Sequence, residues 1–181
     1  MLSKKKVFWF TGLPSSGKTT LGNILETKLK QMNISSFLCD GDQIRKGLCK
    51  DLKFSLEDRN ENLRRAAELI KILLVPYDVV IASFITPTNH IRKKIKEIIS
   101  NQYIEIYLQC SINTCIDRDV KGLYKKAMNN EITDFSGISS PFEEPLSPNL
   151  TLDTENLSIH ESNTILLDFV EKEINADLIL S

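Results

Sequence analysis

A glycine-rich segment follows the first apolar run of the sequence. Residues 12–19 read GLPSSGKT, which fits the pattern GxxxxGK[ST] between a strand-like run and a segment of helical spacing. Glycines let the backbone turn several N–H groups toward anionic oxygens, and the start of a helix adds partial positive charge. In such a loop the lysine reaches the β- and γ-phosphates and the hydroxyl ligates Mg²⁺. The segment therefore predicts an ATP site with Mg²⁺, formed by Gly12, Leu13, Pro14, Ser15, Ser16, Gly17, Lys18, Thr19 and Thr20.

Two acidic residues follow the second apolar run. The stretch FLCDGDQIR places Asp40 and Asp42 directly after an expected strand. Acidic groups beside a phosphate loop can order Mg²⁺-bound water and take a proton from an acceptor hydroxyl. We therefore expect Asp40 to serve the metal and Asp42 to serve the acceptor, as in small-molecule kinases. The alternative is a polar turn that begins the next helix.

Two other classes of phosphate-loop protein lack their markers here. A GTPase needs an NKxD-type guanine motif after a strand, but the run at 104–108 is followed by QCSINTC. A motor ATPase needs an acidic pair at the end of a strand, but VVIASF at 79–84 ends in serine and phenylalanine. The sequence therefore favours a kinase over a switch or a motor.

Apolar runs alternate with segments of helical spacing along the chain. Continuous apolar strands are expected where helices cover both faces of a sheet, and this alternation predicts mostly parallel strands. The fold predicted is α/β, a P-loop NTPase-type three-layer sandwich with a mostly parallel central sheet. We expect strands at 7–11, 36–39, 79–84 and 104–108, and helices at 18–31, from 55 to near 76, at 91–99, 112–118 and 158–173.

The composition is that of an ordinary globular protein. The 181 residues suit one domain, 1–181, and 41% are apolar while 26% are charged. A net charge of -1 gives no indication of nucleic-acid binding, and no apolar run approaches the ~18 residues of a membrane span. None of the four cysteines forms a CxxC pair, and the two histidines lie far from them in the sequence. We therefore expect no zinc site, reduced thiols and a cytoplasmic location.

The alternation stops between residues 119 and 152. This range contains KGLYKKAMNNE, a short helix at best, and then TDFSGISSPFEEPLSPN, which is rich in serine, proline and glycine. A long irregular stretch inside a compact domain is typically a functional lid or a disordered segment. We expect a lid over the phosphate loop.

Several long stretches resemble one enzyme family. They are DGDQIRKGLCKDLKFSLEDRNENLRR, ASFITP, RDVKGLYKKAMNNEITDFSGISSPFEEP and LTLDT. In these the sequence resembles adenylylsulfate (APS) kinases, which make PAPS from APS and ATP. The resemblance extends from about Val7 to Ile165. It implies an enzyme that binds the small nucleotide APS between a P-loop core and a lid, and it implies a homodimer.

The resemblance also implies roles for individual residues. Phe54 and Phe135 would sandwich the acceptor base, and arginines would bind the phosphosulfate. Asp42 would orient and deprotonate the ribose 3'-hydroxyl, with Lys18 and Lys121 neutralising charge on the transferred group. Arg118 would pack near the ATP base. The acceptor contacts implied in full are Asp42, Arg45, Phe54, Arg59, Asn62, Ile85, Thr86, Lys121 and Phe135.

One further catalytic candidate is Ser83, in ASFITP. It matches a serine that family descriptions mark as a phosphoserine intermediate. A strand-end hydroxyl that contacts phosphate is the alternative, because direct transfer between two bound nucleotides needs no covalent step.

Three segments depart from the family pattern. The loop reads PSS where SGS is common, TNHIRKKIKEI lacks an arginine-rich pattern, and ITDF lacks the glycine that often precedes the phenylalanine. Because ring stacking tolerates any base, the same frame could phosphorylate the 3'-hydroxyl of another nucleotide, such as cytidine diphosphoramidate. A nucleotide-sensing module without catalysis is the alternative from another class.

Overall fold

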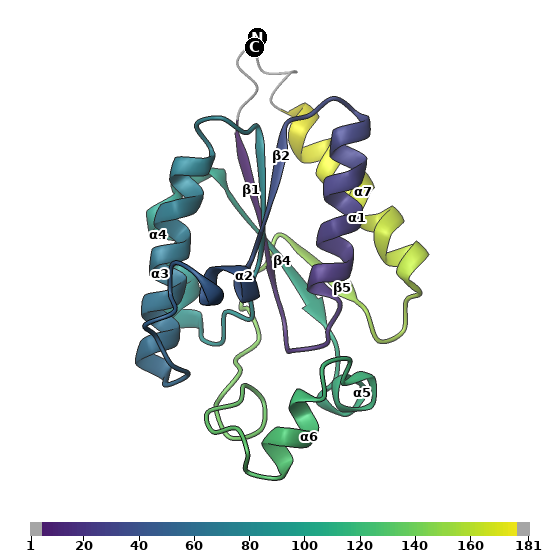
Figure 1. Cartoon of the computed structure of the whole chain (residues 1–181). Helices are drawn as coiled ribbons and strands as arrows, with labels where there is room; N and C mark the ends of the chain where they lie inside the picture. The colour runs from purple at the N-terminus through teal and green to yellow at the C-terminus, as the bar shows by residue number, and fades with distance from the viewer. Residues whose placement is uncertain (1–4, 177–181) are drawn as a thin grey trace.

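The centre of the molecule is a five-stranded sheet in which every pair of neighbouring strands is parallel. In the computed structural model, residues 5–176 are described; 1–4 and 177–181 of the expected domain lie outside this range. The strand order is β2-β3-β1-β4-β5 (Figure 1). The predicted parallel sheet is confirmed. Its strands are β1 (Lys6–Thr11), β2 (Ser36–Asp40), β3 (Val79–Ser83), β4 (Tyr103–Gln109) and β5 (Leu150–Asp153).

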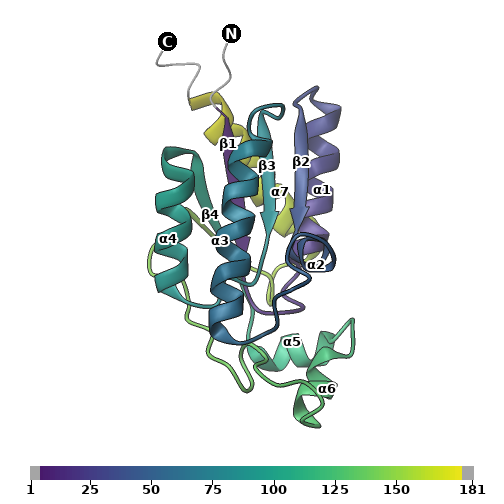
Figure 2. The ribbon, with the colours of Figure 1, turned by 60° about the vertical axis from the view of Figure 1, so that its left-hand side comes forward.

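Helices cover both faces of this sheet. Helices α3 and α4 pack side by side on one face, while α1 and α7 pack on the other (Figures 1 and 2). Each face has its own apolar cluster, so β1 and β3 are buried along their whole apolar runs. The predicted three-layer α/β sandwich is confirmed. The helices are α1 (Lys18–Gln31), α2 (Gly41–Lys46), α3 (Leu56–Leu73), α4 (Asn89–Ile99), α5 (Ile112–Arg118), α6 (Leu123–Met128) and α7 (Ile159–Asn175), with a short 3₁₀ turn η1 (Ser100–Gln102).

Serine caps set the beginnings of three helices. The hydroxyl of Ser55 accepts a hydrogen bond from the amide of Asp58, and Ser111 caps α5 in the same way. Ser158 forms a reciprocal capping box with Glu161 at the start of α7. Each side chain satisfies an amide that the helix itself leaves unpaired. The helix starts predicted at these serines are confirmed.

Two elements were not predicted. Strand β5 has only four residues, and Leu152 is its one buried residue, in register with Leu108 of β4. Four residues with one buried side chain carry no detectable period, so the pairing with β4 defines this strand. Helix α2 is a single short helix capped by Asp40, whose carboxylate accepts from the amide of Asp42.

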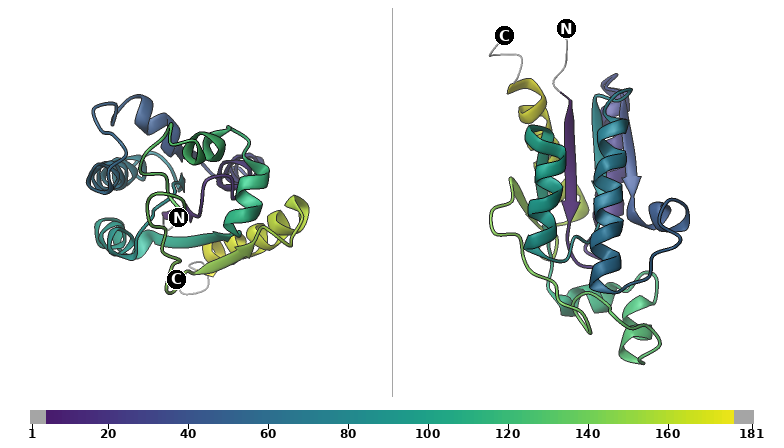
Figure 3. Two further views of the ribbon diagram at one scale, coloured as in Figure 1. Left: turned by 90° about the horizontal axis from the view of Figure 1, so that it is seen from below. Right: turned by 90° about the vertical axis from the view of Figure 1, so that its left-hand side faces the viewer.

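The predicted lid range differs from the central layers. Residues 119–149 contain α6 and irregular chain, and the range expected for the lid extends three residues into β5. Helices α5 and α6 lie beyond the carboxyl ends of the strands (Figures 1 and 3), whereas the chain before β5 returns along the sheet, where the amide of Asn149 donates to the carbonyl oxygen of Glu105 in β4. Within residues 5–176 no helix has the length and apolar character needed to cross a lipid bilayer.

Candidate active site

The phosphate loop connects β1 to α1 and can close only because residue 12 is glycine. Gly12 has a φ of 154°, and a Cβ there would lie 2.7 Å from Ser16 Oγ and 2.8 Å from the carbonyl oxygen of Leu108. Gly17, at φ 98°, occupies the N-cap of α1. Any larger residue at 12 would push the loop off the end of β4. The loop is therefore folded tightly against the sheet edge.

Lys18 folds back into this loop. Its Nζ donates to the carbonyl oxygens of Gly12 (2.9 Å) and Leu13 (2.7 Å), and lies 3.4 Å from Ser16 Oγ. Burial of the ammonium lowers the pKa of Lys18 to about 8, and the nearby Asp40 and Asp42 oppose this shift. An anion inside the loop would replace the carbonyl oxygens as partners of this charge.

Oxygen-bearing side chains gather next to Lys18. Thr19 Oγ1 donates to Asp40 Oδ2 at 3.0 Å, and Asp40 Oδ1 accepts from the amide of Asp42 at 2.8 Å. Asp40 is therefore both the cap of α2 and the neighbour of the P-loop hydroxyl. Thr20 is exposed in the first turn of α1. The structure brings the two predicted metal-side residues, Thr19 and Asp40, into direct contact.

Four of the predicted acceptor residues lie in or near the first turns of α3. Phe54 is 50% exposed, and its ring lies under the guanidinium of Arg45 at 4.6 Å and near that of Arg59 at 5.8 Å. Arg45 Nη1 also donates to the carbonyl oxygen of Lys53. Asn62 is 3% exposed, and its Nδ2 is buried without a hydrogen-bond partner. A buried unpaired amide is costly, so a bound ligand is the natural acceptor for this donor.

Several polar contacts join the lid to the core. Lys121 Nζ forms an ion pair with Asp42 Oδ2, and Tyr124 Oη donates to the carbonyl oxygen of Pro14 at 3.1 Å. Arg59 donates from Nε to the carbonyl oxygen of Phe54 and from Nη1 to Ser136 Oγ, at 2.8 and 2.6 Å. The lid thereby touches both the phosphate loop and the acceptor side.

The lid also has an apolar cluster of its own. Phe135 packs edge-on against Tyr124, with ring centroids 4.9 Å apart. Gly137, at φ 88°, approaches the P-loop so closely that a Cβ would lie 2.8 Å from Leu13 Cδ2. Arg59 contacts the carbonyl oxygen of Phe54 and the hydroxyl of Ser136, which follows Phe135 in the chain. The ring of Phe135 packs against Tyr124 and not against Phe54. The base sandwich stays a prediction. The cluster consists of Leu13, Cys110, Cys115, Tyr124, Ala127 and Phe135.

The segment after β3 carries the other predicted contacts. Ser83 is buried at the end of β3, in register with Phe10 and Asp40. No hydrogen bond between described residues reaches its hydroxyl, which leaves the phosphoserine role without a base. Ile85 is half-buried and Thr86 fully buried, at a left-handed φ of 48°. Trp9 Nε1 donates to Thr86 Oγ1 at 2.8 Å and fixes this turn.

Comparison with known proteins agrees with this geometry. The family model described as adenylylsulphate kinase matches residues 4–153. The chain belongs to the adenylylsulphate kinase family. It is 42% identical to the adenylyl-sulfate kinase of Thermodesulfovibrio yellowstonii over 94% of this chain and 86% of that protein.

Solved structures of the family have the same fold. The Mycobacterium tuberculosis APS kinase, in complex with AMPPNP and APS, superposes with a TM-score of 0.87 at 37% identity, over 93% of this chain and 98% of that one. A hexameric APS kinase from Thiobacillus denitrificans gives 0.69 at 26% identity, covering 94% of this chain and 30% of the other.

Two departures from the adenylylsulphate kinase pattern have a backbone explanation. Ser15 has a φ of 63° and Asp134 a φ of 57°, so both occupy the left-handed region. These are positions where the family commonly has glycine. Asp and Ser are tolerated there at some cost, because short polar side chains fit this region better than branched ones. Both substitutions therefore preserve the chain path of the loop and the lid.

Thr154, directly after β5, was not among the predicted site residues. Its buried Oγ1 lies 3.0 Å from the carbonyl oxygen of Ser16 and 3.1 Å from that of Gln109. Arg118, the predicted neighbour of the ATP base, donates to the carbonyl oxygen of Thr154 at 2.5 Å. Thr154 thus supports the phosphate loop from behind and positions Arg118. The only signal was its place at the end of LTLDT.

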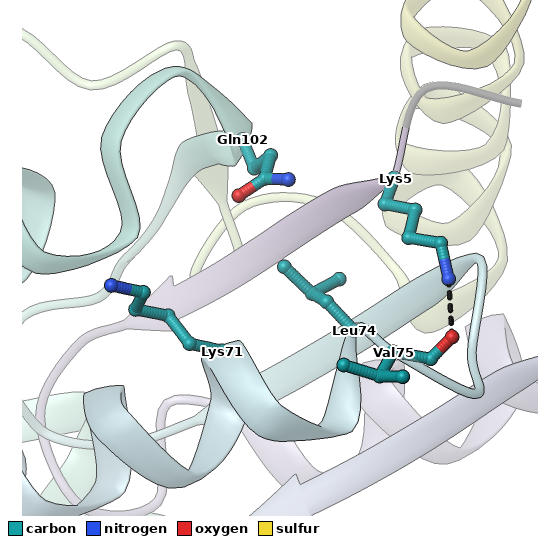
Figure 4. Close-up of a pocket in the computed structure, with 5 residues that line it drawn as sticks. All are labelled: Lys5, Lys71, Leu74, Val75 and Gln102. Atoms are coloured by element: carbon teal, nitrogen blue, oxygen red, sulfur yellow. Dashed lines mark hydrogen bonds between the residues drawn. The ribbon is translucent and has the colours of Figure 1, made fainter.

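A pocket at the opposite end of the sheet is separate from this site. It is lined by Lys5, Lys71, Leu74, Val75 and Gln102, and Lys5 Nζ donates to the carbonyl oxygen of Val75 (Figure 4). These residues precede β1, β3 and β4, whereas ligands of open parallel sheets bind beyond the carboxyl ends of the strands. The pocket contributes nothing to the phosphate chemistry.

The lowered pKa of Lys18 predicts a pH-dependent affinity for ATP. Because phosphate binds the ammonium and not the amine, affinity should fall about thirtyfold as the pH rises from about 7 to about 9.5. Over the same range the empty protein should gain stability from this group, because the unfolded chain still holds the proton that folded Lys18 has lost. Titration calorimetry with ATP measures the affinity. Lys18→Ala is the control, and an equal slope in that variant would contradict the assignment.

Thr154→Val should weaken ATP binding. The substitution keeps the shape of the side chain but removes the hydroxyl behind the Ser16 carbonyl, so the dissociation constant should rise about fivefold. Thr151→Val, at an exposed position in β5, is the matched control and should bind ATP normally. Equal affinities in both variants would remove Thr154 from the loop's support.

Proposed function

We propose that this chain is an adenylylsulfate kinase, which transfers the γ-phosphoryl group of ATP to the 3'-hydroxyl of APS and releases PAPS and ADP. The observation that carries the proposal is the contact between Lys121 of the lid and Asp42 of the core, beside the phosphate loop. This contact puts a cation and a candidate base from segments 79 residues apart into one place. Family membership supports the choice of acceptor.

The transfer is a direct displacement. The 3'-oxygen of the acceptor bonds to the γ-phosphorus of ATP, the bond from that phosphorus to the bridging oxygen breaks, and ADP leaves with the electron pair. Asp42 receives the proton of the 3'-hydroxyl. Lys18 and Lys121 neutralise the charge on the transferred group, so that positioning and electrostatics supply most of the rate.

The residues beside the loop fit a magnesium ion. Thr19 and Asp40 offer a hydroxyl and a carboxylate oxygen already 3.0 Å apart, and Mg²⁺ prefers few protein oxygens, together with water and phosphate. Among residues 5–176 no group of three or more acidic, cysteine or histidine side chains forms a complete metal cage, which fits this sparse mode of binding. When bound, Mg²⁺ would be held by Thr19 and Asp40 and would supply positive charge that stabilises the phosphates during transfer.

The acceptor side offers donors for an anionic nucleotide. Asn62 Nδ2 is buried and unpaired, and the guanidinium groups of Arg45 and Arg59 flank the exposed ring of Phe54. Burial lowers the pKa of both arginines, but their high ordinary values leave them charged. A base stacked on Phe54 would therefore place its phosphosulfate near two cations.

The closed lid serves to exclude water. Arg59, Lys121 and Tyr124 each tie it to a different part of the core. Water inside the site would compete with the acceptor hydroxyl for the γ-phosphoryl group, so closure limits loss of ATP to hydrolysis.

The surroundings of the enzyme are part of the proposal. All four cysteines are free and buried, which suits a reducing compartment such as the cytoplasm. The family resemblance implies a homodimer, and we propose the same assembly for this chain.

Purified protein should form ADP from ATP only when an acceptor is present, and APS should be the preferred acceptor. The measurement is kcat/KM with APS and with cytidine diphosphoramidate in the same coupled assay. Lys18→Ala should abolish both activities, because it removes the charge at the β,γ-bridge. A cytidine acceptor better than APS would overturn the acceptor assignment, and tight ATP binding without acceptor-dependent ADP release would overturn the kinase assignment.

Asp42→Asn should lower kcat by about 100-fold or more while the KM for APS changes by less than about threefold, because the amide cannot take the proton. Steady-state kinetics with varied APS at saturating ATP separate the two constants. Asp168→Asn, an exposed position on α7 remote from the loop, is the matched control. An unchanged kcat in Asp42→Asn would remove the base role.

A further inference from the structure

Arg92 is the one buried charged residue of the run IRKKIKEII. It is 4% exposed, whereas its neighbours Lys93 and Lys94 lie in solvent. A run of this kind usually forms a solvent-exposed helix face, and all the remaining charged residues of α4 are exposed. Burying a guanidinium is costly unless specific partners compensate it. Arg92 therefore needs a structural account of its own.

The guanidinium of Arg92 joins two segments that the reaction uses. Its Nη2 donates to the carbonyl oxygen of Thr86 at 2.7 Å and to that of Glu143 at 2.5 Å. Thr86 is a predicted acceptor contact held at a left-handed φ of 48°, in a region that a branched side chain occupies only under constraint. Glu143 belongs to residues 142–144, in the second half of the lid segment, which we name the strap.

Further contacts fix the strap against the same loop. The amide of Glu143 donates to the carbonyl oxygen of Pro87 at 2.8 Å, and Glu143 Oε2 accepts from the amide of Asn89 at 2.7 Å. The ring of Phe142 lies 5.4 Å from the Arg92 guanidinium carbon. Arg92 is thus sandwiched between the strap and the β3–α4 loop.

A buried carboxylate balances the charge. Arg92 Nε lies 3.5 Å from Glu105 Oε1 of β4, an ion pair without hydrogen-bond geometry, so Nε counts as unpaired. Burial raises the pKa of Glu105, and the arginine opposes that shift. The hydrogen bonds of Arg92 go to Thr86 and Glu143 and, from Nη1, to Asn89 Oδ1 at 2.9 Å, while Glu105 supplies charge.

We infer that Arg92 is a positioning residue, which couples closure of the lid to the conformation of the acceptor-side loop at Thr86. The one nitrogen Nη2 donates to both carbonyl oxygens, so displacement of the strap would remove one of the contacts that fix this guanidinium against Thr86. The inference rests on the proposed function for its consequence in catalysis. The coupling itself is a property of the protein alone.

The test uses Arg92→Met combined with Glu105→Gln. The double variant removes both buried charges, so a loss of stability from an unpaired carboxylate is avoided. Hydrogen exchange should show faster exchange of the Glu143 amide together with the amides of residues 84–86, 88 and 89. Lys94→Met, which removes an exposed charge from the same helix, is the matched control and should exchange like the wild type. Unchanged protection of the strap in a folded double variant would overturn the inference, whatever the enzyme's substrate proves to be.

Kinetics give a second readout that a purely structural role would not move. In the double variant the KM for APS should rise about tenfold and ATP hydrolysis without APS should increase relative to transfer, while the KM for ATP stays within about twofold. Arg92→Lys keeps the charge but not the fork, and it should show the same pattern. Wild-type values of the APS KM and the hydrolysis ratio in both variants would overturn the coupling. A wild-type protein inactive with APS would instead refute the proposed function and leave the exchange experiment decisive.

Discussion

All strands of the sheet run in one direction, and the active-site geometry depends on that constraint. Parallel strands bring their carboxyl ends to one edge, so the phosphate loop, Asp40 and Ser83 become neighbours although the chain separates them widely. Strand β1 lies between β3 and β4, where the connections diverge to opposite sides. This divergence opens the crevice in which ligands of such sheets bind. The acidic residues after β2 therefore face the loop because of topology, not because of their own sequence.

The lid is joined to this edge by a few polar contacts and one apolar anchor. Its cluster is separate from the two core clusters and shares only Leu13 with the phosphate loop. Arg59 donates to lid acceptors at Asp134 and Ser136, and Arg92 donates to Glu143. Opening the lid would break these contacts and loosen the loop at Thr86 while the two core clusters stay intact, as an enzyme that must admit and release two nucleotides requires.

Three of the six non-glycine residues with positive φ between residues 5 and 176 belong to segments around the same crevice. Ser15 in the loop, Thr86 after β3 and Asp134 in the lid all adopt left-handed conformations without being glycine. Such residues persist where surrounding contacts determine the conformation, and they are frequent at functional sites. Here Trp9 and Arg92 hold Thr86, while the contact of Arg59 with the carbonyl oxygen of Asp134 holds the lid turn.

The sequence by itself determined the local features of this protein. The phosphate loop, the strand runs and the caps at Ser55, Ser111 and Ser158 follow from sterics and periodicity within a few residues, and family resemblance supplied the acceptor residues. Only the tertiary structure decided that Lys121 meets Asp42, that Thr154 supports the loop, and that Arg92 is buried while Lys93 is not. The physical reason is that burial and pairing between distant residues depend on which surfaces the fold brings together. Two adjacent basic residues look alike in the sequence, so the sequence does not show which of them will be buried.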